Sequence, residues 1–217
     1  MIDVVDAPEK VTAEWMTQVL RQDGSLAAGN VASLSFEVIG TGKMGENARF
    51  SLVYDQPCES APATVVGKFP ARDSATRMMA GQQGAYYNEV MFYLELAARA
   101  AIRTPHVCGF AVSDDPQLFT LIMEDLTPAE PGSQLEPATL EQARQVAIEA
   151  AKLASAFYGD SALAEYPFIQ SPLTDGGGEI AQTYLEQCWP GFLARFGDAL
   201  SEECREFGTY YVERHNA

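Results

Sequence analysis

Apolar residues fall into five short segments with the alternating or continuous pattern that is typical of β-strands. In the first of them Leu34, Phe36 and Val38 alternate with polar residues, and in the third an apolar run contains a single lysine. The pattern therefore predicts strands over residues 33–40, 49–55, 65–69, 106–113 and 118–126.

Three longer segments carry apolar residues at helical spacing. Residues 12–21 and 139–158 each begin with a threonine, Thr12 and Thr139, that can cap a helix. Between them, residues 83–101 place Tyr86 and Val90 on the apolar face of a predicted helix. Residues 160–217 combine a glycine-rich stretch with further segments of helical pattern. The order of strands and helices along the chain therefore predicts an α+β fold.

A proline-rich stretch, 127–138, separates the strand-rich part of the chain from the helical part. We therefore expect a sheet-containing lobe over 1–126, a linker or hinge over 127–138 and a helical region over 139–217.

Composition narrows the class of protein. The net charge of −16 argues against a nucleic-acid partner, because binding to phosphates needs a basic surface. No apolar run approaches the roughly 18 residues that cross a bilayer, and the first residues lack a signal-peptide pattern. The four cysteines form no C-x-x-C pair. We expect a cytoplasmic protein without a membrane partner, a disulfide framework or a metal motif.

The segment between the first two predicted strands contains Gly40, Gly42 and Gly45 at G-x-G-x-x-G spacing. A dinucleotide-binding fold needs a helix directly after the third glycine, whereas residues 49–55 favour a strand. The Walker A pattern also fails, since Lys43 is followed by Met44. Two readings stay open, which are an ordinary glycine-rich hairpin and a kinase-like hairpin that covers nucleotide phosphates.

Lys68 is the lysine inside the third apolar strand, and Glu89 lies beside the apolar face of the next predicted helix. A lysine there needs a partner, and an inward-pointing glutamate needs a cation. We expect the two to pair, with Glu95 as a weaker alternative partner. A lysine that reaches solvent from an edge strand and a glutamate on a solvated helix face are the ordinary alternatives.

These segments, in this order, resemble the aminoglycoside phosphotransferase superfamily, in particular its choline-kinase-like and ecdysteroid-kinase-like branches. The likeness is carried by "VIGTGKMGENARFSLVYD", "VVGKFPARD", "YYNEVMFYLELAARAAIRTP" and "LFTLIMEDLTPAEPGSQ" and covers about residues 12–160. The resemblance implies a protein-kinase-like small lobe that binds ATP and passes phosphate to a small-molecule alcohol.

The resemblance also implies roles for individual residues. Lys68 would contact the phosphates with Glu89 as its helical partner, and the loop with Gly45, Glu46 and Asn47 would cover them. The hinge that faces adenine would consist of Glu124, Asp125 and Leu126.

The family's catalytic loop, roughly H-x-D-x-x-x-x-N followed by a metal-binding aspartate, has no counterpart in the sequence. Neither His106 nor His215 fits it, so we identify no catalytic residue and expect the Mg²⁺ ligands outside this chain. The chain is expected to stop before the second half of such an enzyme, or to be a naturally short product. A kinase-like module that binds a nucleotide or a partner without chemistry is the alternative function, and a dinucleotide-dependent oxidoreductase is a third.

Overall fold

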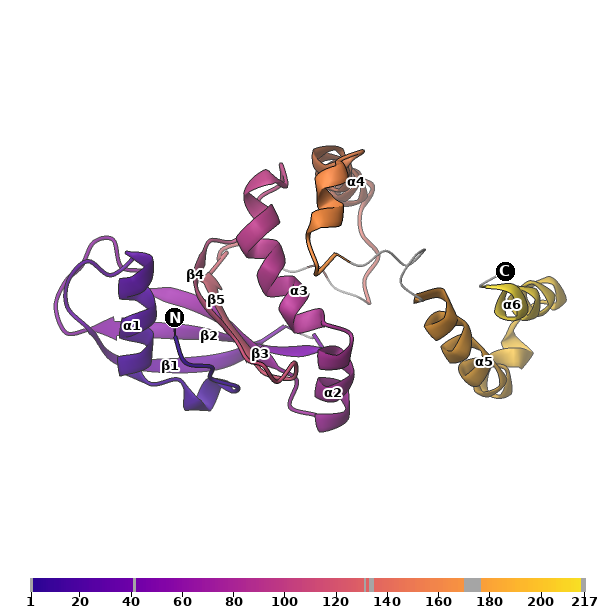
Figure 1. Ribbon diagram of the computed structural model, residues 1–217, viewed down its shortest axis with the longest axis horizontal. Helices are drawn as coiled ribbons and strands as arrows, with labels where there is room; N and C mark the ends of the chain where they lie inside the picture. Colours follow the sequence, from indigo (N-terminus) through magenta and orange to yellow (C-terminus); the bar gives the residue numbers. More distant parts are fainter. Residues whose placement is uncertain (1, 41, 131, 133–134, 170–176, 216–217) are drawn as a thin grey trace. The chain divides into compact units, whose positions relative to one another are not determined.

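The computed structural model describes residues 2–40, 42–130, 132, 135–169 and 177–215. By its internal contacts the chain divides into two units, Met1–Leu163 and Ala164–Ala217. The five-stranded sheet and its flanking helices lie in the first unit (Figure 1).

The sheet contains all five predicted strands, which are β1 Val31–Ile39, β2 Gly45–Tyr54, β3 Thr64–Pro70, β4 Val107–Val112 and β5 Phe119–Glu124. Their spatial order is β1-β2-β3-β5-β4, and every neighbouring pair is antiparallel. With the helices this makes an α+β fold, as the sequence predicts.

Six α-helices occur in the described part of the chain. They are α1 Ala13–Asp23, α2 Ser74–Gln82, α3 Ala85–Met91, α4 Leu140–Phe157, α5 Gly177–Phe196 and α6 Glu202–Arg214. Both predicted caps are present, because the side chain of Thr12 accepts from the N–H of Trp15 and that of Thr139 from the N–H of Gln142. None of the described helices is both long and apolar enough to cross a membrane.

The helical region predicted over 83–101 is more divided than its apolar pattern suggests. Regular α-helix ends at Met91, and a π-helical turn, Phe92–Leu96, and a 3₁₀ turn, Ala97–Arg99, follow it. The chain then leaves through Ala101, whose φ of 53° lies in the left-handed region. Helix α2 was not predicted at all.

The sheet is covered on both faces where β5 runs through its centre. Ile122 packs in a cluster with residues of α1, whereas Leu121 and Met123 pack with residues of α2 and α3 on the other face. Figure 1 shows α1 and α3 on opposite sides of β4 and β5. This alternation decides which residues of the neighbouring strand β3 point toward α3.

In the second unit, α5 and α6 pack against each other. The ring of Trp189 stacks on Phe192 and lies against Gly208 of α6, where a side chain would collide with it.

Candidate functional site

Lys68 points toward α3 because of its position in β3. Val65 and Phe69, at odd positions of the strand, are buried in the cluster with α1. Lys68 therefore faces the other way. It lies opposite Leu121 of β5, whose side chain packs with α3.

The predicted ion pair between Lys68 and Glu89 is present. Lys68 Nζ lies 2.6 Å from each of the two carboxylate oxygens of Glu89. Glu89 precedes the buried Val90 on α3, whereas the alternative partner Glu95 is exposed. The two paired side chains keep 25% and 28% of their surface exposed, so the ammonium is fixed in position yet open to a ligand.

The glycine loop leads into a strand, not a helix, because β2 begins at Gly45. This excludes the helix N-terminus that a dinucleotide-binding fold requires. A side chain at Gly45 would lie 3.1 Å from the carbonyl oxygen of Phe69 and 3.4 Å from Cε of Lys68. Gly40 has φ of 76°, which favours glycine. The two glycines thus allow the loop to turn and to lie close over Lys68.

Five of the residues predicted from the sequence meet at one cavity of about 320 Å³. The hairpin contributes Gly42, Gly45 and Asn47, whereas β3 contributes Lys68 and α3 contributes Glu89. The volume lies within the range of small-molecule sites, which is about 300–1,000 Å³.

Tyr86 also lines this cavity, and its hydroxyl accepts a hydrogen bond from the N–H of Ala71 at 3.1 Å. From the sequence alone, Tyr86 is recognisable only as part of an apolar helix face. A tyrosine in such a stripe gives no signal of its own, because its contact with Ala71 depends on how α3 meets the end of β3.

The side chain of Glu46 does not contribute to the Lys68 cavity. Successive residues of a strand point to opposite faces, and Glu46 meets Arg72 Nε at 2.6 Å instead of Lys68. Arg72 in turn binds Glu9. Glu46, Arg72 and Gly40 line an adjoining cavity of about 390 Å³, which shares Gly42, Gly45 and Asn47 with the first. Arg72 was not predicted.

At the expected hinge, two backbone groups already have partners. The N–H of Glu124 donates to the carbonyl of His106 at 2.8 Å, and the carbonyl of Leu126 accepts from the N–H of Ala129 at 2.9 Å. The carboxylate of Glu124 binds Arg103 at 2.6 Å. Neither Glu124 nor Leu126 lines the cavity above Lys68.

Asp125 ties this hinge to β2. Its carboxylate accepts from Arg49 Nε at 2.8 Å and from the hydroxyl of Thr127 at 2.8 Å. Burial by itself would raise the pKa of Asp125, but the hydrogen bonds from Arg49 and Thr127 outweigh burial and hold that pKa at about 2. Asp125 is thus a charged structural residue at neutral pH.

The residues of the Lys68 cavity do not form a site for Mg²⁺. Glu89 is the one carboxylate among the described residues that line it, and Lys68 already neutralises it. Mg²⁺ takes near-octahedral oxygen ligands, usually including carboxylates.

The geometry suits the binding of an anionic group. Lys43 and Lys68 line the first cavity, Arg72 lines the second, and the glycine loop borders both. Three carboxylates, those of Glu46, Asp73 and Glu89, line the same two cavities, and two of them pair with Arg72 and Lys68. The positive charge that an anionic ligand can meet is therefore that of Lys43 and of the part of the Lys68 ammonium that stays exposed. Neither a family model, nor a curated protein, nor a solved structure matches this chain.

Proposed function

We propose that the chain binds the phosphates of ATP between the glycine hairpin and Lys68, as the nucleotide-binding lobe of a phosphotransferase that acts on a small-molecule hydroxyl. The ion pair of Lys68 with Glu89, 2.6 Å long and open to the cavity under the hairpin, is the observation that carries the proposal. The fold that we propose is protein-kinase-like.

Each element of the cavity has a part in holding the nucleotide. Glu89 fixes the lysine, so less side-chain entropy is lost when the ammonium meets a phosphate. Gly42 and Gly45 let backbone N–H groups approach the phosphate oxygens without a side chain between them. Lys43 adds a second positive charge from the loop above.

Transfer of the phosphoryl group needs more than this chain offers. The attacking hydroxyl has to be oriented, and developing charge on the phosphoryl group has to be stabilised, which Asp, Asn and Mg²⁺ do in kinases. The sequence has no H-x-D-x-x-x-x-N segment. This favours, as a second candidate, a module that holds the nucleotide or a partner without chemistry.

The binding step is tested by titrating ATP into the wild-type chain and into Lys68→Ala. Loss of one charge-assisted contact, worth about 1.5–3 kcal/mol, should weaken binding about 10-fold to 100-fold. Lys152→Ala is the matched control, because Lys152 also forms an ion pair at 2.7 Å, with Glu149, on the exposed helix α4. Equal affinity of the Lys68 variant and the wild type would refute the proposed site.

The two candidate functions separate in a transfer assay. ATP labelled in its γ-phosphate is incubated with Mg²⁺, the protein and a panel of sugars, aminoglycosides and amino alcohols. Transfer that Lys68→Ala abolishes supports the phosphotransferase. Binding of ATP without transfer, in the longest natural form of the protein, supports the non-catalytic module.

A further inference from the structure

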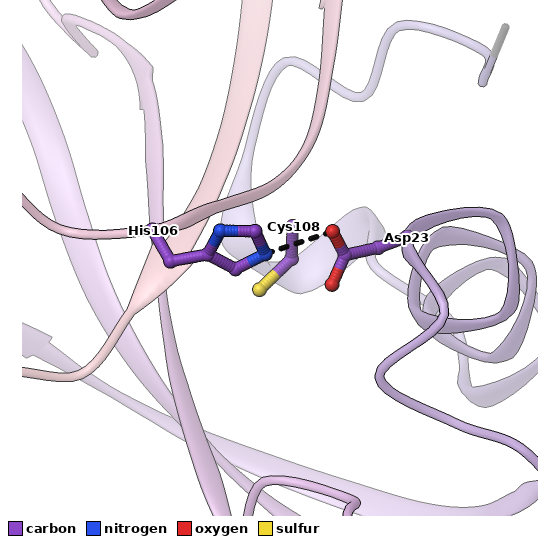
Figure 2. A group of neighbouring side chains, drawn as sticks. All are labelled: Asp23, His106 and Cys108. Atoms are coloured by element: carbon purple, nitrogen blue, oxygen red, sulfur yellow. Dashed lines mark hydrogen bonds and ion pairs between the residues drawn. The ribbon is translucent and has the colours of Figure 1, made fainter. Parts of the chain in front are cut away.

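A second group of side chains lies on the α1 side of the sheet, away from the hairpin. Asp23 is the last residue of α1, His106 immediately precedes β4, and Cys108 lies within β4. One ligand atom from each of these three residues lies within 4.8 Å of the other two. Figure 2 shows the imidazole of His106 and the carboxylate of Asp23 facing each other with the thiol of Cys108 beside them.

We propose that Asp23, His106 and Cys108 bind a Zn²⁺ ion through one carboxylate oxygen, Nε2 and Sγ. A donor set of one oxygen, one nitrogen and one sulfur suits Zn²⁺ and does not suit Mg²⁺ or Ca²⁺, which prefer oxygen alone. The proposal is independent of the function proposed for the hairpin.

The three ligand atoms lie near one another, but not yet at the spacing of a tetrahedral ion. With Zn–O and Zn–N bonds near 2.0 Å and Zn–S near 2.3 Å, two ligand atoms of a tetrahedral site lie about 3.3–3.5 Å apart. His106 Nε2 now lies 2.8 Å from Asp23 Oδ1. These two side chains have to separate by about 0.5 Å to admit the ion, and Cys108 Sγ, which lies within 4.8 Å of both ligand atoms, has to settle about 3.5 Å from them.

The fold places the three ligands for identifiable reasons. Residues two apart in an extended chain share a face, so His106 and Cys108 both look toward α1. The β4–β5 register shifts between Val107 and Gly109, and Cys108 at this shift packs in the cluster that contains residues of α1. Helix α1 ends at Asp23 because Gly24, with φ of 87°, cannot continue it.

Neighbouring groups hold the ligands in place. The backbone N–H of His106 donates to the carboxylate of Glu124 at 3.1 Å, and the backbone N–H of Glu124 donates back to the carbonyl of His106 at 2.8 Å, so the main chain at His106 is fixed. The free oxygen of Asp23 accepts from the hydroxyl of Ser25. A second contact to a ligating carboxylate, as from Ser25 to Asp23, is typical of metal sites, where it orients the ligand.

The site is also open on one side. The three residues line a cavity of about 750 Å³. Cys108 is buried and Asp23 is nearly so, whereas the side chain of His106 is 62% exposed. Three protein ligands leave a fourth position of Zn²⁺ free for water or for a ligand that enters through the cavity.

Binding replaces a proton. Burial, with Asp23 and Glu124 nearby, raises the pKa of the Cys108 thiol to about 12. The thiol is therefore protonated in the metal-free protein, and its proton leaves to solvent as the Zn–S bond forms.

Cobalt substitution tests the site because a thiolate ligand gives Co²⁺ an intense charge-transfer band. The background is the variant Cys58→Ser, Cys188→Ser and Cys204→Ser, in which Cys108 is the one remaining thiol. Co²⁺ should bind one to one with that band and be displaced by Zn²⁺ but not by Mg²⁺. Absence of saturable binding, or binding without the band, would overturn the proposal.

Two ligand variants complete the test. His106→Ala changes an exposed side chain, so the fold should survive, and it should weaken Zn²⁺ binding by more than about 100-fold, beyond the loss that a second-sphere partner causes. Cys108→Ala should abolish the charge-transfer band, with thermal unfolding of the metal-free protein as the check on folding. Wild-type affinity in His106→Ala would show that the imidazole is not a ligand and would overturn the site.

Discussion

Asp125 should give the chain a measurable part of its resistance to acid. Its carboxylate is 5% exposed, and its pKa of about 2 compares with an ordinary value of 3.8. A carboxyl whose pKa is lower in the folded state stabilises that state when ionised. The stabilisation is complete above pH 3.8 and disappears as the pH falls through about 2.

The magnitude follows from the two pKa values. Their difference corresponds to about 2 kcal/mol of unfolding free energy at pH 5 and above, about 1 kcal/mol at pH 3 and less at pH 2. Asp125→Asn removes the charge at every pH. The stability gap between the wild type and this variant should therefore shrink by about 1 kcal/mol between pH 5 and pH 3.

The assay is urea unfolding followed by tryptophan fluorescence in a Trp189→Phe background. Trp189 lies in the second unit, so the remaining Trp15 reports on the unit that contains Asp125. Asp114→Asn, in an exposed turn, controls for the loss of one negative charge. If the difference in unfolding free energy between the wild type and Asp125→Asn stays constant from pH 7 to pH 3, the Arg49 contact does not lower the pKa of Asp125.

Two further changes test the packing of the fold by urea unfolding in the same background. Gly67→Ala should destabilise the chain by about 1–3 kcal/mol, because its new Cβ would lie 2.7–2.8 Å from the buried rings of Phe50 and Phe69. Gly132→Ala, with no atom within 4 Å, should change stability by less than about 0.5 kcal/mol, and equal effects at the two glycines would contradict the argument. Ala101→Gly should stabilise the chain by about 0.5 kcal/mol, because glycine adopts the left-handed φ of 53° without steric strain. The control Ala98→Gly should destabilise the chain, and a loss of stability in Ala101→Gly would show that Ala101 is not strained.

The elements that the sequence predicted are those that local patterns determine. Alternating apolar residues mark the strands, and the caps at Thr12 and Thr139 depend on residues only three positions away. Lys68 and Glu89 are 21 positions apart, yet their pairing could be predicted. Lys68 is a charged residue within an apolar strand, and Glu89 is one beside an apolar helix face, so each needed a partner of opposite charge. It was predictable because each residue was unusual in its own element.

Helix α2 escaped prediction for a physical reason. It has nine residues, and a helix that short is marginal in water unless tertiary packing stabilises it. Its buried residues are Ala80 and Gly81, which are too small to mark an apolar face. The sequence of α2 therefore does not reveal that contacts with the rest of the fold stabilise this helix.

The contacts that no local pattern reveals are those across the sheet. Arg49 and Asp125 are 76 positions apart, and Asp23 and His106 are 83 positions apart. Their meeting depends on the strand order, which inserts β5 between β3 and β4. Cysteine and histidine spacing predicted no metal motif, because one of the three proposed ligands, Asp23, is an aspartate that lies 83 positions before His106 in the sequence.

The same strand order decides which part of the hairpin can respond to a ligand. Arg49 lies two positions beyond Asn47 on the same face of β2, and its bond to Asp125 ties that strand to the end of β5. On the other side of β5, Glu124 holds the backbone of His106 before β4. The base of the hairpin is thus held within the sheet. Because the entropic cost of ordering grows with the number of residues that are fixed, a hairpin base that is already held would add little to the cost of the proposed nucleotide binding.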